Sequence, residues 1–288
     1  MITGGSAGVG YAYAKKLVSQ NIPVVICDIK GVEESVDSLR DGDDNRKVWG
    51  VSCDVSKAED IRKLSDFAVS KLGTISHWVN NAGVNGGRRA LIDVPVDQVE
   101  LVVRVNLLGI LLCSKEAIRV MQDQPSGGYL FNTVGSGVKG GGTPGYACYG
   151  ATKRGLPQLT DSLNKEINDG VQGYDKKVVK GDVKVYSLSP GMVFTKLLLQ
   201  DSTPELRKFP FGVLAAQPEE VADDLVPKML SPPSSTKGTI EFLDTPKILT
   251  KFFERFVMQK KSQYIDDDGS VIRFPGEVYD EEGVRKLY

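Results

Sequence analysis

The sequence predicts an α/β fold, a doubly wound parallel sheet with helices on both faces, plus a C-terminal helical extension. Two observations predict it. Strand and helix patterns alternate along most of the chain, and the expected strands are continuous apolar runs, as in sheets buried on both faces. The 288 residues can bury a core without disulfides. We expect one domain over residues 1–244 and the extension over residues 245–288.

The expected strands end in turns and cover residues 23–28, 48–54, 77–83, 129–133, 183–189 and 238–244. Only Met1 and Ile2 precede the first turn, although a strand has about 5 or 6 residues. We therefore expect a truncated first strand in a natural protein with a longer N-terminus. The sequence shows no targeting peptide, and any such segment would be lost with that strand.

Helical spacing of apolar residues predicts a helix after Gly10 and others over residues 61–72, 96–121 and 149–167. The third should bend near Asn106. Pro157 removes the hydrogen bond to the Lys153 carbonyl, so we expect a kink in the fourth. Residues 171–182 look like a loop insertion between a helix and a strand.

Composition excludes several classes of function. Lys plus Arg is 36 and Asp plus Glu is 37, a balance that argues against nucleic-acid binding. One histidine, His77, and four cysteines without a CxxC pair argue against a metal site. The scattered cysteines suit a reducing compartment. No run approaches 18 apolar residues, so no membrane span is expected.

A glycine-rich turn over residues 3–10 opens the first helix, in the sequence Thr-Gly-Gly-Ser-Ala-Gly-Val-Gly. In a Rossmann-like fold such a turn lets the backbone approach a pyrophosphate, which the helix N-terminus attracts. The candidate cofactor-binding residues are Gly4, Ser6, Gly8, Val9 and Gly10. The alternative interpretation is a tight structural turn.

Asp28 ends the next strand, 18 residues after Gly10. A carboxylate there can bind both ribose hydroxyls of NAD and repel the 2′-phosphate of NADP. Because Lys30 is close by, we expect either NAD(H) or NADP(H), with a preference for NAD(H). The alternative interpretation is a solvated acid at a strand end.

Tyr149 and Lys153 are four residues apart, so they share a helix face. Reduction of a carbonyl needs a proton donor, and a neighbouring lysine cation lowers the pKa of a tyrosine from about 10. Ser136 ends a strand 13 residues earlier and can hold the substrate oxygen. Tyr146 has Gly150 at the matching position and is rejected as the acid. Alone, such a Tyr/Lys pair is more often structural.

Together these motifs resemble the short-chain dehydrogenase/reductase family. The resemblance implies that Tyr149 is the acid/base, Lys153 its activator and a cofactor ligand, and Ser136 the residue that orients the substrate. Asn106 would hold a water in the proton relay. The remaining implied cofactor contacts, including Tyr149 itself, are Asp54, Val55, Asn80, Ala82, Gly83, Pro190, Gly191, Val193 and Thr195. No metal is implied, and the family usually forms homo-oligomers.

Within that family, the runs at residues 149–154, 188–193, 213–222 and 252–256 resemble the chlorophyll(ide) b reductases of plants and algae. The resemblance implies reduction of the 7-formyl group of chlorophyll b or chlorophyllide b to 7-hydroxymethyl in a plastid, in the stroma or at the thylakoid surface, as a homo-oligomer or with a related reductase. Two alternatives stay open: reduction of another small or apolar carbonyl, and a non-catalytic nucleotide-binding scaffold.

Residues 247–261 form a basic amphipathic segment that can lie on a membrane such as the thylakoid, cover a tetrapyrrole, or pack on the protein or a sister subunit. We expect the tail from Asp266 to be solvated and partly mobile. Residues 196–217 are expected to be either a mobile lid over an apolar substrate or an ordinary helix pair packed on the sheet.

Overall fold

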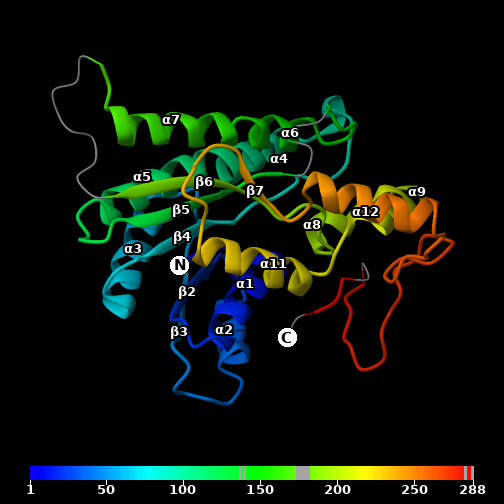
Figure 1. Ribbon diagram of the computed structural model, residues 1–288, viewed down its shortest axis with the longest axis horizontal. Coiled ribbons are helices and arrows are strands. Elements are labelled where there is room, and N and C mark those ends of the chain that lie inside the picture. The colour runs from blue at the N-terminus through cyan, green and yellow to red at the C-terminus, as the bar shows by residue number, and fades with distance from the viewer. Residues whose placement is uncertain (136–137, 139–140, 173–181, 282–283, 287–288) are drawn as a thin grey trace.

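A parallel sheet lies at the centre of the molecule, in a computed structural model that describes residues 1–135, 138, 141–172, 182–281 and 284–286 (Figure 1). Within these residues the sheet has seven strands in the order β3-β2-β1-β4-β5-β6-β7. The strands are β1 (Ile2–Thr3), β2 (Val24–Asp28), β3 (Val48–Ser52), β4 (His77–Asn80), β5 (Gly128–Thr133), β6 (Val183–Ser189) and β7 (Thr239–Glu241).

Helices cover both faces of the sheet, with α1, α2 and α11 on one face and α3, α5 and α7 on the other (Figure 1). The described helices are α1 (Gly8–Ser19), α2 (Val32–Arg40), α3 (Ala58–Leu72), α4 (Val96–Val103), α5 (Ile110–Met121), α6 (Ala147–Arg154), α7 (Leu156–Asp169), α8 (Lys196–Leu199), α9 (Pro204–Leu206), α10 (Gly212–Leu214), α11 (Pro218–Leu230) and α12 (Thr245–Phe256). A 3₁₀ turn forms at Leu91–Asp93, and π-helical segments form at Arg104–Gly109 and Arg207–Phe211.

Strand β2 shows why the apolar runs are continuous. Val24 and Ile26 pack into the core beneath α1 and α11, whereas Val25 and Cys27 pack into the core beneath α3 and α5. Because side chains alternate between the two faces of a strand, both faces must be apolar when helices cover both. The predicted doubly wound parallel sheet is confirmed.

The strand order reverses beside β1. Ile2 pairs with Ile26 of β2 on one side and with Val79 of β4 on the other, and all strands run parallel. The segments that follow β1 and β4 therefore turn toward opposite faces of the sheet. Their divergence opens a crevice at the carboxyl ends of the strands. The segments that follow β1, β2, β4, β5 and β6 all meet at that edge.

Several predicted elements differ in detail. The last strand is shorter, Thr239–Glu241 instead of residues 238–244, and α2 and α11 are additional helices. The expected disturbance near Asn106 is a π-helical segment, Arg104–Gly109. The predicted helix with Pro157 is divided at Gly155 into α6 and α7. Pro157 therefore lies in the first turn of α7, where the backbone N–H groups have no partner within the helix, so the proline costs no hydrogen bond.

The tail from Asp266 is largely exposed to solvent, as expected, but its described part is folded back on the domain. Antiparallel pairings of Ile265 with Val271 and of Tyr279 with Arg285 fold the tail back. Val271 and Val284 pack on a small core beside the sheet, and the Arg285 guanidinium forms an ion pair with Glu219 of α11. Apolar burial and this ion pair hold the tail against the domain.

Residues 196–217 do not form an ordinary helix pair packed on the sheet, and the alternative of a mobile lid over an apolar substrate stays a prediction. They form the short helices α8, α9 and α10 with a π-helical segment between them. These short helices pack around a small separate core, which also takes in residues before and after the segment: Phe194, Leu199, Phe211, Ala215 and Ile265. Most of the predicted insertion at residues 171–182 lies outside the described residues. In the described part of the chain, no helix is long and apolar enough to cross a bilayer.

Candidate active site

A cavity of about 1850 Å³ opens at the carboxyl ends of the strands. Its walls come from the turn after β1, the ends of β2, β4 and β5, helix α6, and the segment from Pro190 to Phe211. Pockets for one drug-sized ligand are about 300–1,000 Å³. The cavity therefore has room for a dinucleotide together with a large substrate.

The turn between β1 and α1 fits a pyrophosphate. Gly4, Gly8 and Val9 line the cavity, and α1 begins at Gly8 without a side-chain cap and without an acid in its first turn. Gly8 has φ +54°, and a Cβ there would lie 3.1 Å from Cγ2 of Thr195, which lines the same side of the cavity. The N–H groups at the start of α1 are thus free of a side-chain cap and can bind an anion. Glycine at position 8 lets the anion come close to the backbone.

Two predicted turn residues shape this site without lining it. A Cβ on Gly10 would lie 2.2 Å from the Gly4 carbonyl oxygen, so only glycine allows the helix to approach the turn. The buried Ser6 donates its backbone N–H to Asp28 Oδ2 at 3.3 Å. The two residues fix the form of the turn rather than touching the cavity.

Asp28 lines the cavity at the end of β2, together with Ile29 and Lys30. Its carboxylate accepts backbone N–H groups from Ser6 and, at 2.8 Å, from Ile29. Burial raises the pKa of Asp28 above its usual value, although both hydrogen bonds and Lys30 act in the opposite direction. An acceptor with a nearby lysine suits the ribose of a nicotinamide dinucleotide, and these residues fit that cofactor.

Asp54 and Val55 also line the cavity, after β3. Asp54 Oδ1 accepts the backbone N–H of Ser56 at 3.0 Å and its hydroxyl at 2.7 Å, which fixes the loop. Val55 packs so closely on the π-helical segment that a Cβ on Gly109 would lie 3.0 Å from Val55 Cγ2.

The end of β4 contributes Ala82 and Gly83 to the cavity wall, but not Asn80. The Asn80 amide points into the interior, where its Nδ2 donates to Asn132 Oδ1 at 2.9 Å. The prediction that Asn80 contacts the cofactor is thus not supported by its position. Asn81 lines the cavity instead and ties β4 to the glycine turn, since its Nδ2 donates to the Gly4 carbonyl at 3.1 Å.

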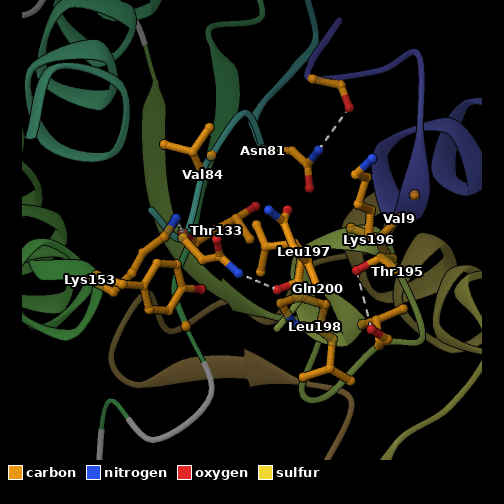
Figure 2. A pocket seen from close by; sticks show the side chains of 18 of the residues that line it. Val9, Asn81, Val84, Thr133, Lys153, Thr195, Lys196, Leu197, Leu198 and Gln200 are labelled. Atoms are coloured by element: carbon orange, nitrogen blue, oxygen red, sulfur yellow. Dashed lines mark hydrogen bonds between the residues drawn. The ribbon is translucent and has the colours of Figure 1, made fainter. Parts of the chain in front are cut away.

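Tyr149 and Lys153 come together on α6, at the inner wall of the cavity (Figure 2). Lys153 is 4% exposed, and its Nζ donates to the Thr133 carbonyl at the end of β5 at 3.0 Å. In Figure 2, Lys153 and Thr133 lie on the side of the cavity opposite Val9 and Thr195.

The Tyr149 hydroxyl faces the chain that leaves β5, since a Cβ on Gly135 would lie 3.1 Å from it. Ser136, the predicted substrate-orienting residue, follows Gly135 but lies outside the described residues. The phenol and the ammonium therefore share one wall of the cavity.

The expected lowering of the Tyr149 pKa is wrong for this cavity. Burial, with a smaller contribution from Tyr146, raises the pKa of Tyr149 to about 12, and burial lowers the pKa of Lys153 to about 8. The ammonium lies 6.0 Å from the centre of the tyrosine ring. At that distance its attraction for a phenolate is weaker than the cost of burying the charge.

Asn106 lies in the π-helical segment and is completely buried. Its Nδ2 donates to the Val84 carbonyl at 2.7 Å, and its Oδ1 accepts the Val84 N–H at 2.9 Å. The side chain is occupied by this pairing and does not line the cavity. That Asn106 holds a water in a relay stays a prediction.

Pro190, Gly191, Val193 and Thr195 line the cavity after β6, as predicted from the sequence. Gly191 has φ +73°, and a Cβ there would lie 2.8 Å from Leu243, so the turn requires glycine. Val193 pairs with Ala216, which holds this segment over the cavity.

The cavity also has a wall that the sequence did not identify. Val284, Arg285 and Lys286 line it from the C-terminal tail, beside Leu206 and Phe211. No sequence pattern relates the end of the chain to the cavity, because only the folding of the tail onto α11 brings them together. The apolar character of residues 196–217, by contrast, did point to this wall.

Known proteins match both the sequence and the fold. The family model described as short chain dehydrogenase matches residues 1–205. The chain is 38% identical over 275 residues to the chloroplastic chlorophyll(ide) b reductase NOL of Oryza sativa subsp. japonica, covering 93% of this chain and 78% of that protein. It is 39% identical to the Arabidopsis thaliana protein of that name, covering 93% and 76%. The crystal structure of levodione reductase superimposes with a TM-score of 0.72 at 21% identity, over 85% of this chain and 96% of that one.

These matches agree with the geometry of the cavity, in which a glycine turn, an acid at the end of β2 and a buried Tyr/Lys pair surround one crevice. The family model covers the glycine turn, Asp28, Tyr149 and Lys153, and the relatives extend over most of the chain. The chain belongs to the short-chain dehydrogenase/reductase family of NAD(P)-dependent oxidoreductases.

Proposed function

We propose that this chain is a chlorophyll(ide) b reductase, which reduces the 7-formyl group of chlorophyll b or chlorophyllide b to 7-hydroxymethyl. The observation that carries the proposal is the 38–39% identity with chlorophyll(ide) b reductases over 93% of the chain. The cavity supports it, since its volume of about 1850 Å³ and its apolar wall suit a large, flat, apolar carbonyl compound beside a dinucleotide.

Each residue of the pair has a defined task in this reaction. A nicotinamide cofactor, when bound, supplies a hydride to the formyl carbon. Tyr149 donates its hydroxyl proton to the formyl oxygen, which completes the alcohol. Lys153 stabilises the resulting phenolate and can bind the nicotinamide ribose from its position beside Thr133. Ser136 is proposed to orient the formyl oxygen.

Asp28 favours NAD(H) in this proposal, because its carboxylate would repel a 2′-phosphate, whereas Lys30 on the same wall would attract one. We place the enzyme in a plastid, in the stroma or at the thylakoid surface, since the relatives are named chloroplastic. A homo-oligomer, or a complex with a related reductase, belongs to the same proposal, as does work at a membrane surface.

The test is incubation with chlorophyll b and either NADH or NADPH, followed by the loss of absorbance of the formyl pigment. Tyr149→Phe should lower kcat by roughly 10²–10⁴-fold while circular dichroism and nucleotide binding stay unchanged, because only the proton donor is lost. Tyr146→Phe is the matched control and should retain turnover. Full activity in Tyr149→Phe would contradict the assigned role, and wild-type reduction of small ketones but not of the pigment would contradict the substrate.

A further inference from the structure

We propose that α12 and Phe209 form a docking face for an anionic lipid bilayer, from which a lipid-soluble pigment reaches the cavity. The pigment part rests on the proposed function. Helix α12 lies at one end of the molecule beside α9, away from the sheet (Figure 1, orange). It contains no buried residue, although six of its twelve residues are apolar or aromatic.

The apolar side chains of this face are turned to solvent. Leu249 is 64% exposed, Phe253 55% and Phe256 61%, and the exposed surface continues over Val257 and Met258. Large apolar side chains gathered on one surface mark an interaction site in soluble proteins. The protein itself therefore leaves these side chains uncovered, whereas Ile248 and Phe252 of the same helix are half-buried.

Local contacts fix the helix in this orientation. The Asp244 carboxylate caps it by accepting the Lys247 N–H at 2.9 Å. The Lys247 ammonium reaches across to Asp224 of α11 and lies 4.6 Å from the centre of the Phe242 ring. The exposed face thus belongs to an anchored helix and not to a loose end.

Charge favours a lipid bilayer over a second copy of the chain as the partner. Lys251, Arg255, Lys260 and Lys261 flank the apolar residues, with Glu254 as the acid within the helix. Lys260 pairs with Glu254 and Lys261 with Asp267, but exposed pairs of this kind are weak enough to exchange for lipid phosphates. A second copy would present the same excess of basic residues, so it offers these cations fewer anionic partners than lipid phosphates do.

Phe209 connects this face to the cavity wall. Phe209 is 51% exposed, and its ring centre lies 6.1 Å from that of Phe252 and 6.4 Å from that of Phe256. Its neighbours Pro210 and Phe211 line the cavity. A bilayer into which the α12 side chains insert would thus lie next to the apolar cavity wall at Pro210 and Phe211.

The first test is flotation of the purified full chain, without pigment or nucleotide, on vesicles of phosphatidylcholine with and without phosphatidylglycerol. The wild type should float with the anionic vesicles. The double variant Phe253→Asp, Phe256→Asp should lose at least about tenfold in binding, and Lys251→Gln about fivefold on anionic vesicles alone. Ile92→Asp, which changes a 92% exposed residue elsewhere, is the matched control and should bind like wild type.

The proposal would be overturned if the wild-type protein floated with neither kind of vesicle. It would also be overturned if the double variant floated as well as the wild type. A concentration-dependent wild-type dimer, seen by ultracentrifugation, that the double variant abolishes while vesicle binding is absent would overturn it too.

A second readout separates this face from the reductase activity. Since Phe253 and Phe256 do not line the cavity, the double variant should reduce detergent-dispersed pigment at the wild-type rate but pigment in vesicles more slowly. If the wild type reduces no pigment in either form yet floats, the proposed function fails and the docking face stands. If the variant loses activity on both forms equally, the assigned role of the face fails.

Discussion

At the scale of single residues, Lys153 shows how burial governs the chemistry of the site. The residue is 4% exposed, and its ammonium donates a hydrogen bond to the Thr133 carbonyl. Burial disfavours the charged form, which lowers the pKa from its ordinary value of 10.5 to about 8. The ligand-free protein therefore holds a lysine that is neutral over part of the alkaline range.

This pKa has a consequence for stability. Between about pH 8 and 10.5 the unfolded chain binds the lysine proton and the folded chain does not, so the free energy of unfolding should rise with pH. The gain relative to Lys153→Met should reach a few kcal/mol at most. Urea unfolding of both proteins across this range measures the difference, and equal pH profiles would show that the lysine is not neutral in the folded state.

At the scale of elements, the turn between β1 and α1 depends on close backbone approach. A Cβ on Gly10 would lie 2.2 Å from the Gly4 carbonyl oxygen and 2.5 Å from Asn81 Nδ2. Neither neighbour can retreat, because Asn81 is bonded to the same carbonyl at 3.1 Å. Gly10 therefore decides how closely the start of α1 can approach the glycine turn and Asn81 in the cavity wall.

Gly10→Ala should destabilise the protein by roughly 3 kcal/mol or more and abolish nucleotide binding, because the helix must move away from the turn. Gly150→Ala is the matched change on α6, where a Cβ would meet nothing within 4 Å. It should stabilise the fold by about 0.5–1 kcal/mol. Urea unfolding and nucleotide titration measure both variants, and equal stabilities for the two would contradict the packing argument.

At the scale of the whole molecule, the chain beyond the sheet returns to complete the cavity. The Tyr264 ring packs edge-on against Phe194 at 5.3 Å between centres, and its hydroxyl donates to Glu220 at 2.8 Å. Phe194 precedes Thr195 on the cavity wall, and Glu220 holds the start of α11 by accepting the Gln217 N–H at 2.7 Å. Tyr264, just before the tail, thus supports two segments that border the cavity.

Tyr264→Phe should cost about 1 kcal/mol, since one hydrogen bond is lost. Tyr264→Ala should cost about 2 kcal/mol or more and raise the KM for pigment more than it lowers kcat, because the ring supports the wall and not the Tyr149/Lys153 pair. Thermal unfolding and steady-state kinetics separate the two effects. A fall in kcat at constant KM in the alanine variant would show that Tyr264 acts on the chemistry itself.

The layered sheet, the glycine turn, Asp28 at a strand end and the Tyr149/Lys153 pair could be predicted from the sequence, because strand periodicity, glycine conformation and helical spacing are local properties. Which of these groups face the cavity depends on how the whole chain packs. Asn80 and Asn106 turn inward to satisfy buried polar groups. The pKa values of Tyr149 and Lys153 follow from burial, which no sequence spacing records. The closure of the cavity by the tail depends on contacts between residues distant in the chain, and these form only when the whole chain packs.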